Sequence, residues 1–243
     1  MENSSKICQH CTNDIYPDIR DNVPHEIAET SFGLGILFGV ALGSIPFLQF
    51  KPFNLYILSL ALFHFLEYYI TAKYNPKKVN SQSFLLNNGI EYTMAHVVAV
   101  LEFLLEGYFC PKLKAYNSSK FCQVFTVIGI ISVVVGQLIR SLAMYTAGKS
   151  FSHNIKIKKE KDHTLVTHGV YSWLRHPSYF GFYLWALGTQ LTLLNPITFI
   201  GFCIVLHQFF SRRISFEERH LLDFFGQDYV KYKQSVKIWI PFM

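Results

Sequence analysis

Two short polar segments in the C-terminal half of the chain contain residue types that could bind and align charged reactants. The first is RHPSYFG at 175–181, in which Arg175 and His176 precede Pro177. Proline is favoured in the first turn of a helix, because its missing N–H is not needed there. We therefore expect a helix to begin at Pro177, with its first free N–H groups forming a site for a carboxylate or phosphate beside Arg175.

The second segment contains Arg213 and Glu217, which are four residues apart and so share one face of a helix. A plain ion pair on a helix surface is one interpretation. The other is a binding site, because an apolar hairpin that turns at Asn195-Pro196 would bring this segment back to the first one. We favour the binding site, with one soluble and one lipidic substrate.

The composition predicts that membrane helices position these segments. Apolar residues make up 51% of the chain and charged residues only 16%. Four apolar stretches are long enough to cross a bilayer core of about 30 Å, at residues 31–50, 53–72, 90–109 and 121–145. Two shorter runs, 179–194 and 197–210, would form the hairpin. We predict an all-α polytopic integral membrane protein of about six transmembrane helices, the last two being this short hairpin.

These elements suggest three regions. A cytosolic N-terminal tail (residues 1–30) precedes four transmembrane helices (31–145), and a catalytic region (146–243) follows. The catalytic region would contain a polar cofactor loop, the hairpin at 179–210, and an amphipathic stretch at 211–236. We expect that stretch to form one or two helices along the membrane surface.

The distribution of basic residues predicts the orientation. With six crossings, both termini and the polar loop lie on one side, which holds seventeen of the 22 Lys and Arg residues, whereas the opposite loops hold four. The positive-inside rule places the richer side in the cytosol. The net charge of +6 therefore reflects membrane topology, and we expect no nucleic-acid partner.

Several ionisable residues fall inside the apolar stretches. Glu102 and Glu106 share one helical face, and either a functional role or a wet interface would explain them. Arg140 could reach the headgroups or pair with a carboxylate, and we favour the headgroups. His64 is expected to be hydrogen-bonded in the core.

Three glycines of the first apolar stretch, Gly35, Gly39 and Gly43, recur every four residues. Such a stripe allows another helix to approach closely. The partner is either a helix of the same chain or a second copy in a homodimer.

The cysteines predict neither a disulfide framework nor a metal site. They are five in number, which is odd, and Cys8 and Cys11 form a CxxC pair that no second ligand pair follows. We expect no metal.

Several motifs together resemble one known family. HTLVTHGVY, RHPSYFGF, LLNP, and FFSRRISFEE followed by FFGQDYVKYK are similar to motifs of the membrane-embedded isoprenylcysteine carboxyl methyltransferases. Upstream, FHFLEYYITAKYNP and SFLLNNG resemble the fungal members that methylate a mating pheromone and other prenylated proteins. The looser pattern RHPxYxG with a later Glu-Glu also occurs in phospholipid N-methyltransferases and sterol reductases. The resemblance spans residues 16–243.

The resemblance implies S-adenosylmethionine as methyl donor and a C-terminal S-farnesyl or S-geranylgeranyl cysteine as acceptor. It also implies prenylated CaaX proteins as partners, such as small GTPases and a lipopeptide pheromone, and the endoplasmic reticulum membrane as location. Arg213 takes the position assigned to the prenyl substrate. The donor-binding positions would be Lys156, His163, Thr164, Leu165, Val166, Tyr171, His176, Pro177, Ser178, Tyr179 and Glu217.

The implied reaction needs alignment rather than a base. A C-terminal carboxylate has a pKa of about 3.5 and is already ionised at neutral pH. We therefore expect Arg213, with Arg175, to bind the acceptor carboxylate through the planar guanidinium. Glu217 is expected to bind hydroxyl or ammonium groups of the donor. The alternatives are a phospholipid N-methyltransferase, whose amine acceptor would require a base, a nicotinamide-dependent reductase, and a non-catalytic transporter or membrane scaffold.

Overall fold

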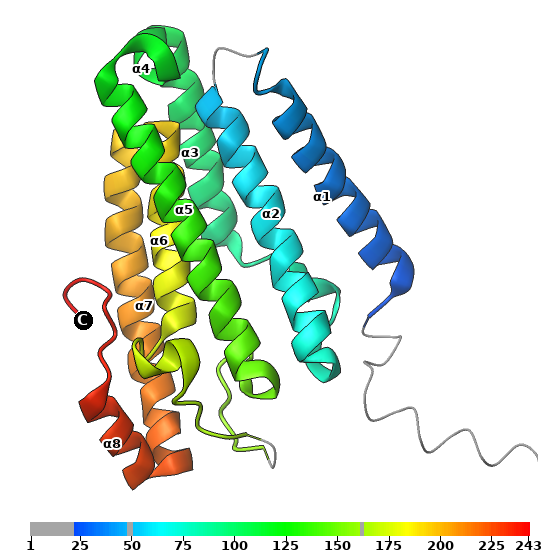
Figure 1. Cartoon of the computed structure of the whole chain (residues 1–243), viewed down its shortest axis with the longest axis vertical. Coiled ribbons are helices and arrows are strands. Elements are labelled where there is room, and N and C mark those ends of the chain that lie inside the picture. Colours follow the sequence, from blue (N-terminus) through cyan, green and yellow to red (C-terminus); the bar gives the residue numbers. More distant parts are fainter. Residues whose placement is uncertain (1–21, 48–50, 161–162) are drawn as a thin grey trace, which may run out of the picture.

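The computed structural model describes residues 22–47, 51–160 and 163–243, so that Cys8 and Cys11 lie outside the described residues. Within these ranges every regular element is an α- or 3₁₀-helix, as predicted. The long helices lie side by side in an elongated bundle and run between its two ends (Figure 1). They are α1 (Pro24–Ser44), α2 (Lys51–Tyr74), α3 (Ile90–Phe109), α5 (Lys120–Ala147), α6 (Pro177–Leu193) and α7 (Pro196–Phe225).

The short helices mark the two ends of the bundle. One end carries α4 (Pro111–Lys114), and the opposite end carries α8 (Gln227–Ser235) together with the long connection between α5 and α6 (Figure 1). The 3₁₀-helices lie in the connections, at η1 (Pro76–Lys78), η2 (Ser81–Phe84), η3 (Tyr116–Ser118), η4 (Gly148–Ser150) and η5 (Gly169–Ser172).

Length and composition identify four candidate membrane spans among the described residues, at α1, α2, α7 and a stretch at Lys120–Ser150 that contains α5. The remaining two long helices run beside them (Figure 1). One is α3, and the other is α6, which has 17 residues and is therefore about 26 Å long. The predicted membrane-helix architecture is thus present, while the number of crossings stays a prediction.

The bounds of two helices differ from the prediction. The first span begins at Pro24 rather than at Ser31. The stretch 211–236 was expected to form one or two surface helices, but its first part belongs to α7, which runs unbroken from Pro196 to Phe225 and ends before Gly226, whose φ is +52°. Only α8 forms a separate helix in that stretch. The prediction relied on the change from apolar to charged residues, and that change does not interrupt a helix.

Reciprocal glycine contacts bring α5 and α6 unusually close together. A Cβ atom added to Gly136 of α5 would lie 2.5 Å from the backbone nitrogen of Trp185 and 2.6 Å from the carbonyl oxygen of Gly181. A Cβ atom added to Gly188 of α6 would lie 2.8 Å from the carbonyl oxygen of Gly129. Gly181 and Gly188 of α6 therefore pack directly against the backbone of α5.

The glycine stripe of α1 makes no such contact. A Cβ atom at Gly35, Gly39 or Gly43 would have no described atom within 4 Å. Instead α1 packs within the chain through Leu34 and Ala41, which are both buried. The alternative in which the stripe packs against a helix of the same chain is therefore wrong, and the homodimer stays a prediction.

Buried charges hold the turn between α6 and α7. The fully buried Lys114 forms an ion pair with Glu106 at 2.6 Å and donates to Asn195 Oδ1 at 2.7 Å. Glu102 is also buried and accepts the N–H of Thr198 in the first turn of α7 at 2.7 Å. Glu102 and Glu106 thus have a structural role that neither interpretation from the sequence anticipated.

We predict that Gly136→Ala destabilises the protein, whereas Gly39→Ala does not. The added methyl group would press into the α6 backbone in the first variant, and overpacking of this kind costs about 1–3 kcal/mol. In the second it would meet open space. Thermal unfolding of the two purified variants measures the difference. Identical melting temperatures for both variants and the wild type would contradict the close packing of α5 and α6.

Candidate active site

A cavity of about 260 Å³ lies at the end of the bundle that carries the α5–α6 connection and α8. Its lining comes from α5, the α5–α6 connection, the start of α6, the second half of α7, α8, and the segment just before α3. The two polar segments singled out in the sequence therefore meet around one space. The predicted site residues that line it are Arg175, Arg213, His163, Thr164, Leu165, Val166, Tyr171, His176, Pro177, Ser178, Tyr179 and Glu217.

Lys156 is the predicted donor-binding residue that the structure does not bring to the cavity lining. Its Nζ lies 3.3 Å from a carboxylate oxygen of Glu160, one helical turn away in sequence. Desolvation lowers the pKa of Lys156 from its usual value, and the nearby Lys78 lowers it further. The side chain is therefore part of a charge cluster on the connection.

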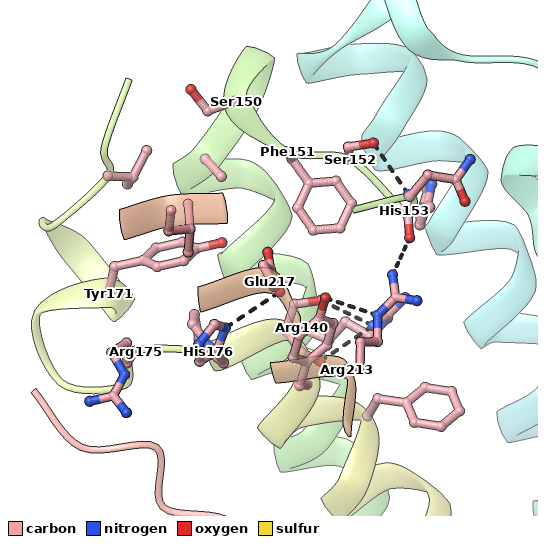
Figure 2. A pocket seen from close by; sticks show the side chains of 18 of the residues that line it. Arg140, Ser150, Phe151, Ser152, His153, Tyr171, Arg175, His176, Arg213 and Glu217 are labelled. Carbon is pink, nitrogen blue, oxygen red and sulfur yellow. Dashed lines mark hydrogen bonds and ion pairs between the residues drawn. The ribbon is translucent and has the colours of Figure 1, made fainter. Parts of the chain in front are cut away.

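Arg213 is held by two hydrogen bonds (Figure 2). Its Nε donates to the Tyr179 hydroxyl at 2.9 Å, and its Nη2 donates to the His153 carbonyl oxygen at 2.5 Å. Among the described residues no ion pair within 4 Å joins Arg213 to Glu217, so the plain surface pair considered from the sequence does not form. The guanidinium and the carboxylate instead line the same cavity.

Three polar atoms in the cavity lining are buried and have no hydrogen-bond partner in the described part of the chain. They are Glu217 Oε2, His163 Nδ1 and the Tyr229 hydroxyl. The ring nitrogen Nδ1 of His176 lies 3.7 Å from Glu217 Oε2. Buried polar groups normally find partners, and these three would satisfy a ligand that offers ammonium, hydroxyl and ring-nitrogen groups.

The start of α6 has fewer free N–H groups than the predicted anion site would use. The N–H groups of Tyr179 and Phe180 both donate to the carbonyl oxygen of His176 at 3.1 Å, so they are not free. Pro177 does begin the helix, as predicted. The bond from Phe180 is the ordinary first bond of an α-helix, and the bond from Tyr179 belongs to a tighter first turn, so neither N–H group is open to a ligand.

Arg175 faces away from Arg213, towards the C-terminal segment (Figure 2). Its Nε donates to Glu218 Oε1 at 2.7 Å, and its Nη1 donates to the carbonyl oxygens of Lys233 at 2.9 Å and Val236 at 2.8 Å. The side chain therefore ties the end of α8 to α7. This geometry leaves it poorly placed to reach a ligand that Arg213 holds.

Sequence reasoning missed a buried network beside the cavity. Arg140 does not extend to the headgroups. It is buried, forms an ion pair through Nε with Glu67 Oε1, and donates from Nη2 to Glu67 Oε2 at 2.8 Å. His153 Nε2 lies 3.0 Å from Glu67 Oε2. These residues are far apart in sequence. The available signal was that an acidic residue, Glu67, and a basic residue, Arg140, both fall within apolar stretches.

The apolar part of the lining was also missed. It includes the side chains of Leu85, Phe151, Phe182, Phe209 and Phe210. The Phe-Phe pair that precedes the SRR motif was the available signal, because it places two aromatic rings one turn before Arg213. One side of the cavity is therefore suited to a hydrocarbon.

Three comparisons with known proteins agree. The family model described as isoprenylcysteine carboxyl methyltransferase (ICMT) matches residues 127–223. A protein-S-isoprenylcysteine O-methyltransferase of Saccharomyces cerevisiae is 56% identical over 228 residues, which cover 94% of this chain and 95% of the relative. A Homo sapiens protein of the same name is 42% identical over 220 residues, which cover 90% of this chain and 75% of that protein. A solved structure of the eukaryotic intramembrane Ras methyltransferase ICMT matches with a TM-score of 0.84 and 39% identity, covering 89% of this chain and 76% of that one.

A helical membrane bundle with a cavity of this kind, together with these matches, defines an intramembrane methyltransferase. The chain belongs to the isoprenylcysteine carboxyl methyltransferase family. The resemblance read from the motifs is thereby confirmed, and the phospholipid N-methyltransferase and transporter alternatives are not favoured. The family implies S-adenosylmethionine as donor, and the unpartnered atoms of the cavity fit such a ligand. In the described residues no group of three or more His, Cys, Asp or Glu side chains is placed to hold a metal ion.

We predict that Arg175→Ala and Glu218→Gln each loosen the C-terminal segment. Arg175→Ala removes the bonds to Glu218 and to the carbonyl oxygens of Lys233 and Val236. Glu218→Gln removes the charge that pairs with Arg175 and with Lys233, which lies 2.6 Å away. Hydrogen exchange should rise in residues 233–243 in both variants and stay unchanged in α5. Unchanged exchange in residues 233–243 of Arg175→Ala would refute this role.

We predict that His163 makes the fold less stable in acid. Burial lowers its pKa to about 4, whereas the unfolded chain has a pKa of about 6.5. Between these values the unfolded chain binds a proton that the folded one does not, so stability falls as the pH drops through this window and is retained above it. His163→Gln should reduce the loss of melting temperature between about pH 7.5 and about pH 5. An equal loss in both proteins would contradict the buried, neutral imidazole.

Proposed function

We propose that this enzyme transfers a methyl group from S-adenosylmethionine to the C-terminal carboxylate of an S-farnesyl or S-geranylgeranyl cysteine. The supporting observation is that one cavity combines an arginine, unpartnered polar atoms and an aromatic wall at one end of a membrane bundle. A soluble charged donor and a lipidic acid require these three properties together.

The polar side of the cavity is assigned to the donor. S-adenosylmethionine, when bound, supplies an electrophilic methyl group on a sulfonium. The Glu217 carboxylate would accept hydrogen bonds from ammonium or hydroxyl groups, and His163 and Tyr229 would meet ring or hydroxyl groups. The stacked rings of His176 and Tyr179, 5.6 Å apart and inclined by 8°, add a flat aromatic surface. The other donor positions in this assignment are Thr164, Leu165, Val166, Tyr171, Pro177 and Ser178, whereas Lys156 is left out because it does not line the cavity.

The apolar side is assigned to the acceptor. The guanidinium of Arg213 would bind the acceptor carboxylate through the edge that its two protein hydrogen bonds leave open. Phe209 and Phe210 would lie along the prenyl chain. No proton is abstracted, because the carboxylate is already ionised, and alignment with exclusion of water can supply about 7–11 kcal/mol of the barrier. Arg175, which sequence reasoning placed beside this carboxylate, is proposed to position the C-terminal segment instead.

We further propose that all six long helices cross the endoplasmic reticulum membrane. Both termini and the cavity would face the cytosol, where the positive-inside rule places the basic end. Prenylated CaaX proteins, including small GTPases and a lipopeptide pheromone, would be the substrates. The open glycine stripe of Gly35, Gly39 and Gly43 would be available to a second copy of the chain.

We predict that Glu217→Gln and Arg213→Lys separate the two halves of the site. Glu217→Gln should weaken donor binding about tenfold or more, since a charge-assisted hydrogen bond is lost. Arg213→Lys should leave donor binding intact and lower kcat/KM for the acceptor about 100-fold, because an ammonium cannot make the planar fork. Calorimetry measures donor binding. Transfer of labelled methyl to a farnesylated cysteine analogue measures kcat/KM for the acceptor.

Arg212→Lys is the matched control, because Arg212 is adjacent and exposed and does not line the cavity. Its activity should equal that of the wild type. Base-labile label on the cysteine analogue identifies the carboxyl ester, whereas label that appears in phospholipid would overturn the proposed reaction. Near-normal turnover of Arg213→Lys would overturn the acceptor assignment alone.

A further inference from the structure

We propose that the buried ion pair of Glu67 and Arg140 positions the Arg213 guanidinium. The proposal rests on the assigned role of Arg213 in binding the acceptor carboxylate. Glu67 does not line the cavity. Arg140 does line it, but its guanidinium is bonded to Glu67 and Ser178, so we treat both as positioning residues. The argument follows two chains of contacts that leave the pair and end on the same side chain.

The first chain runs through the α5–α6 connection. Because Glu67 is paired with Arg140, its carboxylate is ionised and can only accept hydrogen bonds. His153 Nε2, 3.0 Å away, must therefore donate to it, which fixes the orientation of that ring. The backbone carbonyl of the same residue accepts from Arg213 Nη2. Glu67 thus determines where this carbonyl oxygen lies.

The second chain runs through the first turn of α6. Arg140 Nη1 donates to the Ser178 hydroxyl at 3.0 Å and to the Ser178 carbonyl at 3.3 Å. The next residue, Tyr179, accepts from Arg213 Nε through its hydroxyl. The rings of Phe63 and Phe182, each 5.4 Å from the Arg140 guanidinium, keep that guanidinium in place. Arg140 thus determines where the α6 turn presents this hydroxyl.

The two chains hold two different nitrogens of the Arg213 guanidinium. A free arginine side chain samples many rotamers, and fixing Nε and Nη2 together fixes the plane of the group. The direction in which a bound carboxylate faces the donor follows from that plane. A buried ion pair contributes little net stability, so its main effect here is on geometry.

A double-mutant cycle between Glu67 and Arg213 tests the proposal. Glu67→Gln should lower kcat/KM for the farnesylated acceptor about tenfold in the wild type, while the donor dissociation constant stays unchanged. In the R213K background the same substitution should cost less than about twofold, because residues that act through each other are not additive. Additive effects of the two substitutions would overturn the proposal.

Glu102→Gln is the matched control, because Glu102 is also a buried carboxylate but caps α7 at the opposite end of the bundle. Its effect should be the same in both backgrounds. If Glu67→Gln does not accumulate, Glu67→Asp and His153→Asn take its place in the cycle, since both keep the buried charges. If these too are additive with R213K, the proposal fails. Full activity of R213K would instead show that the acceptor assignment is wrong.

Discussion

Charges buried inside a membrane bundle have to find their partners within the protein, and this constraint organises the structure at both ends. Water is absent from the bilayer core, and an unpaired charge there costs several kcal/mol. Near the cavity the constraint joins α2 to α5 through Glu67 and Arg140. At the other end it joins α3 and α4 to the α6–α7 turn through Lys114 and Glu102. The short hairpin is therefore fixed at its turn and at its open end.

Close backbone packing makes the pairing near the cavity possible. A Cβ atom on Gly181 would lie 2.7 Å from the backbone nitrogen of Arg140, so only glycine lets α5 and α6 meet at this level. That approach brings Arg140 within hydrogen-bonding distance of Ser178. Packing and electrostatics thus depend on each other here, because a wider spacing between the helices would leave the arginine without its partners on α6.

Sequence patterns predicted the helices well because the signals for them are local. The length of an apolar stretch indicates a helix, and the prolines at Pro177 and Asn195-Pro196 mark where helices begin. The convergence of the RHPSYFG segment with Arg213 and Glu217 also followed from the hairpin. The patterns failed where the answer depended on distant partners or on details of a turn. Arg140 was assigned to the headgroups because Glu67, its partner, is 73 residues away. The end of the last span was placed at Phe210 because polarity was taken for a helix boundary.

The unbroken course of α7 has a consequence for the spacing of the two reactants. Arg213 and Glu217 are separated by one turn of the same helix, about 6 Å along its axis, and no glycine or proline lies between them. The spacing of these two residues therefore does not depend on the connection or on α8, which line other parts of the cavity. The distance between the proposed acceptor-binding and donor-binding residues is thus fixed by a single unbroken helix.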